Sequence, residues 1–348
     1  MDILKIFLPT TITFVIGLLI APLISNFLYK HKCWKKKSVA VTTDGEIASV
    51  SQKLHNDEER KTPRMGGILI WSSAMITILI FWIGAYIDSP TLEKLNFLSR
   101  NQTWLPLFTL IVGALFGLID DYFSVAEKYD QKGGGLSSKK RLLGVFIIAL
   151  IGAWWFYSKL EMTEIIIPFV GVWDAGLLFF VFFVLVMLGT YSGGVIDGLD
   201  GLSGGIFSII FGAYGMIAFN QSQIDLAAFC FVIVGGLLAF LWFNIPPARF
   251  FMSETGTMSL TMTLVVVAFL TKQVLILPII AFPLVISSGS SIIQLLSKKF
   301  RHGKKVFLVA PLHHHFQALG WPATKVVMRY WVLGIIFAFL GIIISLIG

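Results

Sequence analysis

Long apolar stretches, separated by short polar segments, make up most of this chain. Ten of them approach the roughly 20 mostly apolar residues that a helix needs to cross a bilayer: 5–29, 66–87, 104–119, 141–157, 176–192, 202–219, 226–243, 258–271, 273–296 and 328–347. Several are short or interrupted, and only Lys272 and Gln273 separate the eighth from the ninth. The pattern predicts an all-α integral membrane protein with about ten transmembrane helices, organised as a single polytopic membrane domain over residues 1–348.

One segment between two of these stretches has a different pattern. Residues 161–174 contain Pro168 and Gly171, and their apolar residues alternate with polar ones. Alternation around turn-forming residues is typical of a hairpin. We therefore expect a short external hairpin here.

The basic residues give the expected orientation. Five of the 27 lysines and arginines lie on one side of the predicted helices, and these are Lys5, Lys94, Arg100, Lys159 and Lys272. The other 22 lie in or beside the loops on the opposite side, namely 30–65, 120–141, 193–201, 244–257 and 297–329. Because loops rich in lysine and arginine stay in the cytoplasm, we expect both termini to be external and these five loops to be cytoplasmic.

Composition excludes an ordinary soluble protein. Hydrophobic residues make up 56% of the chain and charged residues only 13%, whereas soluble domains carry about 25% charged residues. Two cysteines form no disulfide framework. The net charge of +8 is explained mainly by the excess of lysine and arginine in the predicted cytoplasmic loops, and binding of an anionic substrate is a further explanation. We therefore expect membrane lipid, and no nucleic acid, as a partner.

Acidic residues mark two of the predicted cytoplasmic loops. Asp120 and Asp121 end the third apolar stretch, where adjacent carboxylates favour a bound cation or a raised pKa on one of them. A solvated pair of loop acids is the alternative. Asp197 and Asp200 lie in a glycine-rich segment, 193–205, and glycines let the backbone approach a ligand closely. Tight helix packing through small residues is the alternative there.

Two further predicted cytoplasmic segments carry unusual polar residues. Glu254 is a lone acid between two apolar segments, and a simple loop residue is the alternative explanation. Three consecutive histidines, at 313–315, follow a cluster of basic residues that comprises Lys298, Lys299, Arg301, Lys304 and Lys305. Adjacent histidines point in different directions on most backbones, so a zinc site is disfavoured.

Taken together, the acids, histidines and lysines are expected on one face of the membrane. Carboxylates and cations at a water–lipid boundary suit magnesium and phosphate chemistry, because Mg²⁺ prefers oxygen ligands and phosphoryl transfer depends mainly on positioning and charge neutralisation. A transporter would instead place ionisable residues in broken helices at the middle of the membrane. The position of the acids at helix ends favours an enzyme.

Several blocks of sequence resemble the bacterial phospho-N-acetylmuramoyl-pentapeptide transferase family, within the polyprenyl-phosphate N-acetylhexosamine-1-phosphate transferase superfamily. The blocks are Lys-Thr-Pro-Arg-Met-Gly-Gly at 61–67, Asp-Asp-Tyr at 120–122, Asp-Gly-Leu-Asp-Gly-Leu at 197–202, Phe-Met-Ser-Glu-Thr-Gly at 251–256 and Pro-Leu-His-His-His-Phe at 311–316. The tail at 320–331 also matches, so the resemblance covers nearly the whole chain.

The resemblance implies ten transmembrane helices with both termini outside, in the bacterial inner (cytoplasmic) membrane. It implies transfer of phospho-MurNAc-pentapeptide from UDP-MurNAc-pentapeptide to undecaprenyl phosphate, with release of UMP and a requirement for Mg²⁺. This is the first membrane step of peptidoglycan synthesis. It leaves the oligomeric state open, with a homodimer among the options.

The resemblance also implies residue roles. The catalytic residues by this comparison are Asp120, Asp121, His313, His314 and His315. The substrate-binding residues are Lys61, Arg64, Asp197, Asp200 and Phe251, with Phe251 against the uracil. The metal ligands are Glu254 and Asp197.

This chain departs from the family pattern at several of these positions. Tyr191 and Gly194 stand where two asparagines are usual, Glu254 replaces an aspartate, and Arg64 replaces a threonine. We hypothesise that two departures are coupled, with the longer Glu254 filling the space left at Gly194. The alternative functions are a related transferase that uses another UDP-N-acetylhexosamine and a non-catalytic lipid-binding relative.

Overall fold

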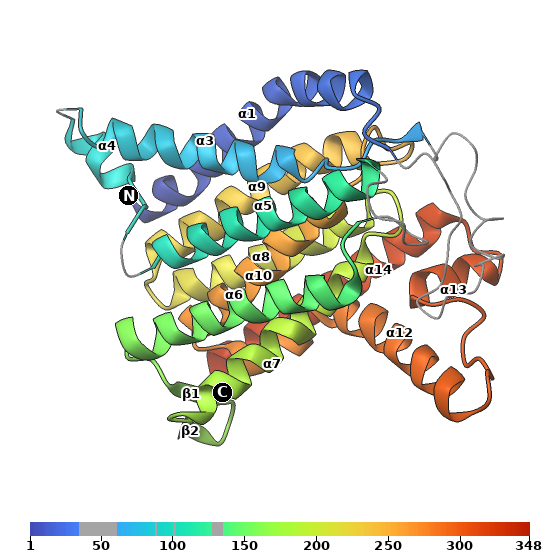
Figure 1. Ribbon diagram of the computed structural model, residues 1–348. Coiled ribbons are helices and arrows are strands. Elements are labelled where there is room, and N and C mark those ends of the chain that lie inside the picture. Colours follow the sequence, from blue (N-terminus) through green and yellow to red (C-terminus); the bar gives the residue numbers. More distant parts are fainter. Residues whose placement is uncertain (35–60, 88, 100–101, 127–134) are drawn as a thin grey trace.

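The computed structural model describes residues 1–34, 61–87, 89–99, 102–126 and 135–348, and most of them are helical. The longer helices lie side by side in a bundle, except that the one at 282–300 points away from it at an angle (Figure 1). They are α1 (Asp2–Lys30), α3 (Ile68–Gly84), α5 (Trp104–Ala126), α6 (Ser138–Lys159), α7 (Leu178–Ser192), α8 (Leu202–Asn220), α9 (Ile224–Asn244), α10 (Ser253–Leu270), α12 (Phe282–Phe300) and α14 (Ala323–Ile347). The shorter elements are α4 (Pro90–Leu95), η2 (Gly193–Ile196), η3 (Val274–Ile276), α11 (Leu277–Ile280) and α13 (Leu312–Ala318).

The described residues contain eight helices that are long and apolar enough to cross a membrane, or nine if a bent pair counts as one span. One of these eight spans, Leu178–Ile196, joins α7 to η2, and the apolar α3, with seventeen residues, is shorter than all eight spans. All ten predicted stretches coincide with helical segments, so the expectation of a multi-helix membrane protein is confirmed at this level. Ten crossings and their orientation stay predictions.

The ninth predicted stretch, 273–296, is not one straight helix. Residues Val274–Ile280 and Phe282–Phe300 meet at an angle of 81°. Pro278 and Pro283 each lie in the first turn of their helix. Proline lacks an amide hydrogen and is accepted in a first turn but not in a helix interior, which explains why a new helix begins here. Hydropathy alone does not reveal this bend.

Helix α10 lies at the centre of the bundle. Of its most apolar 18-residue window, 94% is buried inside the protein, although the helix is rich in serine and threonine. Four of these hydroxyls donate to carbonyl oxygens four residues earlier, which satisfies them without a partner on another helix; these are Thr257, Ser259, Thr261 and Thr263. A hydroxyl-rich helix can therefore be buried.

Small residues bring α5 against α10. A Cβ atom on Gly113 would lie 2.8 Å from the Cα of Ser259, and one on Gly117 would overlap the main chain of Glu254. Close backbone approach through glycine is a common way for membrane helices to pack. The contact at Gly117 lies one turn before Asp120, so it places that acid beside the first turn of α10.

The predicted hairpin is confirmed at 161–174. Strands β1 (Glu164–Ile167) and β2 (Gly171–Asp174) pair antiparallel, with Glu164 opposite Asp174 and Ile167 opposite Gly171. The amide of Phe169 in the hairpin turn donates to the carbonyl oxygen of Gly348 over 3.4 Å. Figure 1 shows both termini at the hairpin end of the bundle and α13 at the opposite end. Residues 35–60 of the basic loop, and Gly133 and Gly134, lie outside the described residues.

Candidate active site

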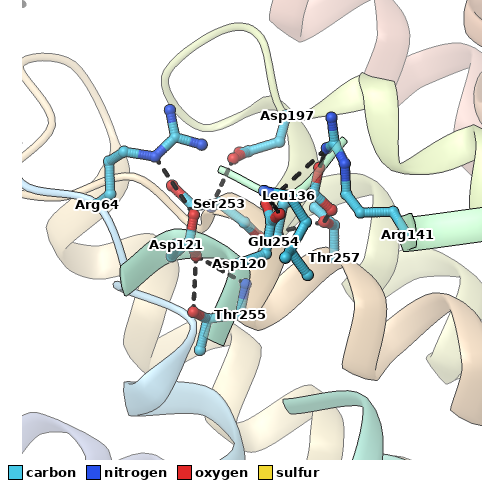
Figure 2. A network of polar contacts seen from close by, with 10 residues as sticks. All are labelled: Arg64, Asp120, Asp121, Leu136, Arg141, Asp197, Ser253, Glu254, Thr255 and Thr257. Carbon is cyan, nitrogen blue, oxygen red and sulfur yellow. Dashed lines mark hydrogen bonds and ion pairs between the residues drawn. The ribbon is translucent and has the colours of Figure 1, made fainter. Parts of the chain in front are cut away.

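Asp121 connects α5 to α10 in a network of polar contacts (Figure 2). Its Oδ2 accepts hydrogen bonds from the amide and the hydroxyl of Thr255, at 2.9 and 2.7 Å. Its Oδ1 accepts from Nε of Arg64 at 3.3 Å. The side chain is fully buried. Both oxygens are thus used to hold three segments of the chain together.

Asp120 has a more open environment. Its Oδ1 accepts a hydrogen bond from the amide of Leu136 at 2.7 Å, and its Oδ2 lies 3.9 Å from Nη1 of Arg141. Gly135, before Leu136, has a φ of +80°. A Cβ atom there would lie 3.2 Å from the carboxylate of Asp120, so glycine permits both the left-handed backbone and the close approach.

Glu254 lies in the first turn of α10 and points toward α6. Its Oε1 accepts a hydrogen bond from Nη1 of Arg141 at 2.7 Å, and its Oε2 accepts one from the Thr257 hydroxyl at 3.4 Å. The structure differs from the hypothesis that Glu254 fills the space at Gly194. A Cβ atom on Gly194 would have only the Thr257 side chain within 4 Å. The longer acid reaches Arg141 instead.

The glycine-rich segment 193–201 faces the first turn of α10. Asp197 accepts hydrogen bonds from the Ser203 hydroxyl and from the Ser253 amide, both at 2.7 Å. Burial raises the pKa of the Asp197 carboxyl above its ordinary value, and the hydrogen bonds partly offset that rise. Asp200 accepts from the amide of Ala248 at 3.0 Å.

A buried asparagine connects the loops that carry two of the predicted substrate-binding residues. Asn244, at the end of α9, is 1% exposed. Its Oδ1 accepts from the amide of Gly201, and its Nδ2 donates to the carbonyl oxygen of Phe250, both at 2.9 Å. The segment with Asp200 and the segment with Phe251 are therefore tied to the same side chain.

The segment 61–67 pairs with the segment before α10. The amide of Phe251 donates to the carbonyl oxygen of Pro63 at 2.9 Å, and the amide of Gly66 donates to the carbonyl oxygen of Phe251 at 2.8 Å. This pairing holds Arg64 in position beside Asp121. Lys61 is exposed, and the side chain of Phe251 is half-buried.

The three histidines have three different environments. His313 is fully buried, and within the described residues neither of its ring nitrogens has a hydrogen-bond partner. Burial holds the pKa of His313 well below its ordinary value. A Cβ atom on Gly198 would overlap His313. His314 bonds through Nδ1 to Oε1 of Gln317 at 2.8 Å, and Nδ1 of His315 accepts from the amide of Leu308 at 3.2 Å.

The segment before the histidines is held by side chains of α12. Oε1 of Gln294 accepts from the amides of Val306 and Phe307, both at 3.0 Å, and its Nε2 donates to the carbonyl oxygen of Phe307 at 2.9 Å. The Ser297 hydroxyl donates to the carbonyl oxygen of Lys304 at 2.8 Å. All of these bonds reach the main chain of the segment.

The acidic cluster has oxygen donors of the kind that magnesium prefers. No three Asp, Glu, His or Cys side chains among the described residues are arranged to hold one metal ion. Mg²⁺, however, is often held by one or two carboxylates together with substrate phosphates. Asp120 and Glu254 both face the same nitrogen of Arg141, so two carboxylates of the kind that Mg²⁺ prefers lie on the same side of that arginine. Asp197, the other predicted ligand, has both oxygens hydrogen-bonded to serines.

The structure thus brings Arg64, Asp120, Asp121, Asp197 and Glu254 into one network (Figure 2). Sequence reasoning missed Arg141, which was counted only as a loop charge. It comes after two exposed lysines, Lys139 and Lys140, at the start of an apolar run. Of these three basic residues, Arg141 is the one next to the apolar run. That position is the signal that could have marked it as a partly buried charge.

Comparisons with known proteins show which family the chain resembles. The family described as "Glycosyl transferase family 4" matches residues 103–272. A protein of Anoxybacillus flavithermus (strain DSM 21510 / WK1), named phospho-N-acetylmuramoyl-pentapeptide-transferase, is 35% identical over 336 residues, which is 96% of each chain. Relatives of the same name from Bacillus anthracis (strain A0248) and Bacillus thuringiensis (strain Al Hakam) are 37% identical over 338 residues, again 96% of each chain.

Proposed function

This chain belongs to the phospho-N-acetylmuramoyl-pentapeptide-transferase family, and from that premise we propose that it transfers phospho-MurNAc-pentapeptide from UDP-MurNAc-pentapeptide to undecaprenyl phosphate. An oxygen of the lipid phosphate attacks the phosphorus next to the sugar. The bond from that phosphorus to the oxygen bridging the two phosphates breaks, so UMP leaves and a lipid-linked diphosphate sugar forms. The observation that supports this most directly is the cluster of Asp120, Asp121, Glu254 and two arginines at one end of the bundle.

Asp120 is the acid best suited to take a proton from the lipid phosphate. Its Oδ2 has only a distant contact with Arg141, at 3.9 Å, whereas both oxygens of Asp121 are engaged by Thr255 and Arg64. A base needs a free oxygen within reach of the proton it removes. Asp121 then acts by positioning: it holds the end of α5 against the start of α10.

Magnesium is the cofactor that this site would use, held by Glu254 and the substrate phosphates, with Asp120 beside it and Oδ2 of Asp120 left to accept the proton. When bound, it would neutralise charge on the phosphates and lower the barrier to their approach. Asp197 joins as a ligand only if it gives up its bonds to Ser203 and Ser253. The chain itself supplies Arg64 and Arg141 as fixed positive charges near the same carboxylates.

The remaining predicted residues have proposed binding roles. Phe251 would stack on the uracil, and Asp197 and Asp200 would line the nucleoside region. Exposed Lys61 would attract the anionic substrate. His314 and His315 would contact phosphate or sugar, whereas buried His313 contacts the loop at Gly198 and would act through that loop.

The membrane arrangement is part of the proposal. The chain would form one polytopic domain with ten crossings in the bacterial inner membrane. Both termini and the hairpin would be external, and the acidic cluster cytoplasmic, where the UDP-linked substrate is soluble. A homodimer is compatible with this arrangement.

The test is UMP release by purified protein. The assay contains polyprenyl phosphate, Mg²⁺ and either UDP-MurNAc-pentapeptide or UDP-GlcNAc, with a parallel sample in excess chelator. We expect UMP only with UDP-MurNAc-pentapeptide, none with chelator, and recovery on adding Mg²⁺. Release with UDP-GlcNAc alone would favour the related transferase, and no release with either donor would favour a non-catalytic lipid-binding protein.

A further inference from the structure

One guanidinium nitrogen is shared by the proposed base, Asp120, and the proposed metal ligand, Glu254. Nη1 of Arg141 lies 2.7 Å from Oε1 of Glu254 and 3.9 Å from Oδ2 of Asp120 (Figure 2). The two acids come from different helices, α10 and α5, and Arg141 reaches them from a third, α6. A single positive charge therefore lies where two acidic side chains converge.

Without this arginine the acids would be poorly compensated. The Asp120 side chain is 5% exposed and the Glu254 side chain 22%, and a carboxylate removed from water is strongly destabilised unless a charge or hydrogen bond compensates it. Arginine keeps its charge at any relevant pH. Arg141 thus supplies the compensation in the substrate-free protein.

The contact is nevertheless not the strongest that arginine can make. Arginine binds a carboxylate best through two parallel hydrogen bonds, but one nitrogen of Arg141 serves both Glu254 and Asp120 here. Its Nε is buried and has no hydrogen-bond partner within the described part of the chain. The Tyr191 hydroxyl also contacts this guanidinium. The N–H donors that remain of the five suit another oxygen-rich group, and phosphate is the anion whose geometry they match.

We propose that Arg141 is a placeholder cation, which neutralises Glu254 and Asp120 before substrate binds, gives up Glu254 to the incoming divalent cation, and then donates to the substrate phosphates. This inference rests on the proposed function. It follows that Arg141 and the metal ion compete for Glu254 in the substrate-free protein. Substrate phosphates would relieve that competition, so metal and substrate would bind cooperatively.

Metal binding without substrate tests the competition directly. Free Mn²⁺, a stand-in for Mg²⁺, is measured by electron paramagnetic resonance in titrations of purified wild-type protein and of Arg141→Gln. We expect Arg141→Gln to bind Mn²⁺ about tenfold more tightly, within the range of typical coupling between two sites. Its KM for UDP-MurNAc-pentapeptide should rise, because the phosphates lose a partner.

The matched control is Lys139→Gln. Lys139 is exposed in the same helical turn, so this change removes one positive charge nearby without touching the cluster. We expect its Mn²⁺ affinity to stay within about twofold of wild type, since exposed charges are screened by salt. An equal gain in Mn²⁺ affinity in both variants would mean that the loss of any nearby positive charge has the same effect, and would overturn the proposal. So would Arg141→Gln binding no more tightly than wild type.

Arg141→Lys keeps the measurement decisive if Arg141→Gln does not fold. Lysine retains the charge but is shorter and lacks the planar fork, so it should hold the two acids less firmly and raise Mn²⁺ affinity by a few fold. Wild-type affinity in this variant would count against the proposal. Failure of the proposed function can be told apart from failure of this proposal. The first would appear as absence of UMP release by wild-type protein, whereas the Mn²⁺ titration does not depend on UMP release.

Discussion

Asp120 and Asp121 are neighbours in the sequence, but they differ in what surrounds them. Asp121 accepts three hydrogen bonds and is fully buried. Asp120 accepts one from Leu136 and faces Arg141 at 3.9 Å. We therefore expect the two identical side chains to have separable roles, Asp121 in holding the structure and Asp120 in the chemistry.

Substituting each aspartate by asparagine should separate these roles. Asp120→Asn should lower the rate of UMP release by about 10²–10⁴-fold, the usual loss when an acid–base group is removed, with little change in thermal unfolding. Asp121→Asn should also destabilise the protein by about 1–3 kcal/mol, because an amide cannot accept all three bonds. Thermal unfolding in detergent measures this, and equal melting temperatures would contradict the division.

Asn244 provides a second residue-scale test. Asn244→Asp keeps the size and the acceptor oxygen but removes the donor to Phe250, leaving a carboxylate next to a carbonyl oxygen in a buried site. Asn244→Leu instead removes both bonds. We expect either change to cost about 1–3 kcal/mol and to raise the KM for the UDP-linked donor. A wild-type KM in both variants would show that the tie between the two loops does not matter for binding.

The sequence predicted the acids of the cluster but not what connects them. Asp120, Asp121, Asp197 and Glu254 stood out because carboxylates are rare at the ends of apolar stretches. Arg141, the partner of Glu254, did not stand out in the sequence. The two residues are 113 positions apart, and only the packing of α6 brings them together. Glu254 reaches Arg141 and does not fill the space at Gly194, since a pattern does not say which way a side chain points. The coupling of the two positions stays a prediction.

At the scale of elements, the contact between α5 and α10 positions the site. Gly113 and Gly117 allow the two backbones to meet, and Asp120 and Asp121 follow in the next turn of α5. The sequence predicted these helices from their apolar residues. It did not predict which helix lies at the centre, because α10 is no more apolar than the others and its hydroxyls are satisfied locally.

Gly117→Ala should disturb the site from a distance. The added methyl would overlap the carbonyl group of Glu254, so the helices must separate by a few tenths of an ångström or more. We expect a lower melting temperature and reduced UMP release. Gly212→Ala is the control, because a methyl there meets no atom within 4 Å, and alanine favours a helix over glycine by about 1 kcal/mol. Equal behaviour of the two variants would refute this account.

At the scale of the whole molecule, the acidic cluster and the hairpin lie at opposite ends of the bundle (Figure 1). The C-terminal carbonyl group bonds to the hairpin turn, so the C-terminus and the hairpin share one side whatever the orientation. The distribution of lysine and arginine predicts that this side is external. That prediction depends on charge alone, because hydropathy does not distinguish the two faces of a membrane.

Cysteine labelling checks the orientation in intact cells. Val170 in the hairpin turn is 79% exposed, so Val170→Cys should react with a membrane-impermeant maleimide added outside. His302→Cys, exposed beyond α12, should react only after the membrane is opened. The native cysteines, Cys33 and Cys230, are both buried and give little background. The reverse labelling pattern would invert the proposed topology.

The way Gln294 and Ser297 hold the segment before the histidines bears on how this protein can evolve. Their bonds reach main-chain atoms of Lys304, Val306 and Phe307, and main-chain atoms are the same for nearly every amino acid. The side chains of this segment can therefore change during evolution while its main-chain conformation stays the same. We expect most substitutions within the segment to be tolerated. Few should be tolerated at Gln294, because its one side chain makes three of these hydrogen bonds.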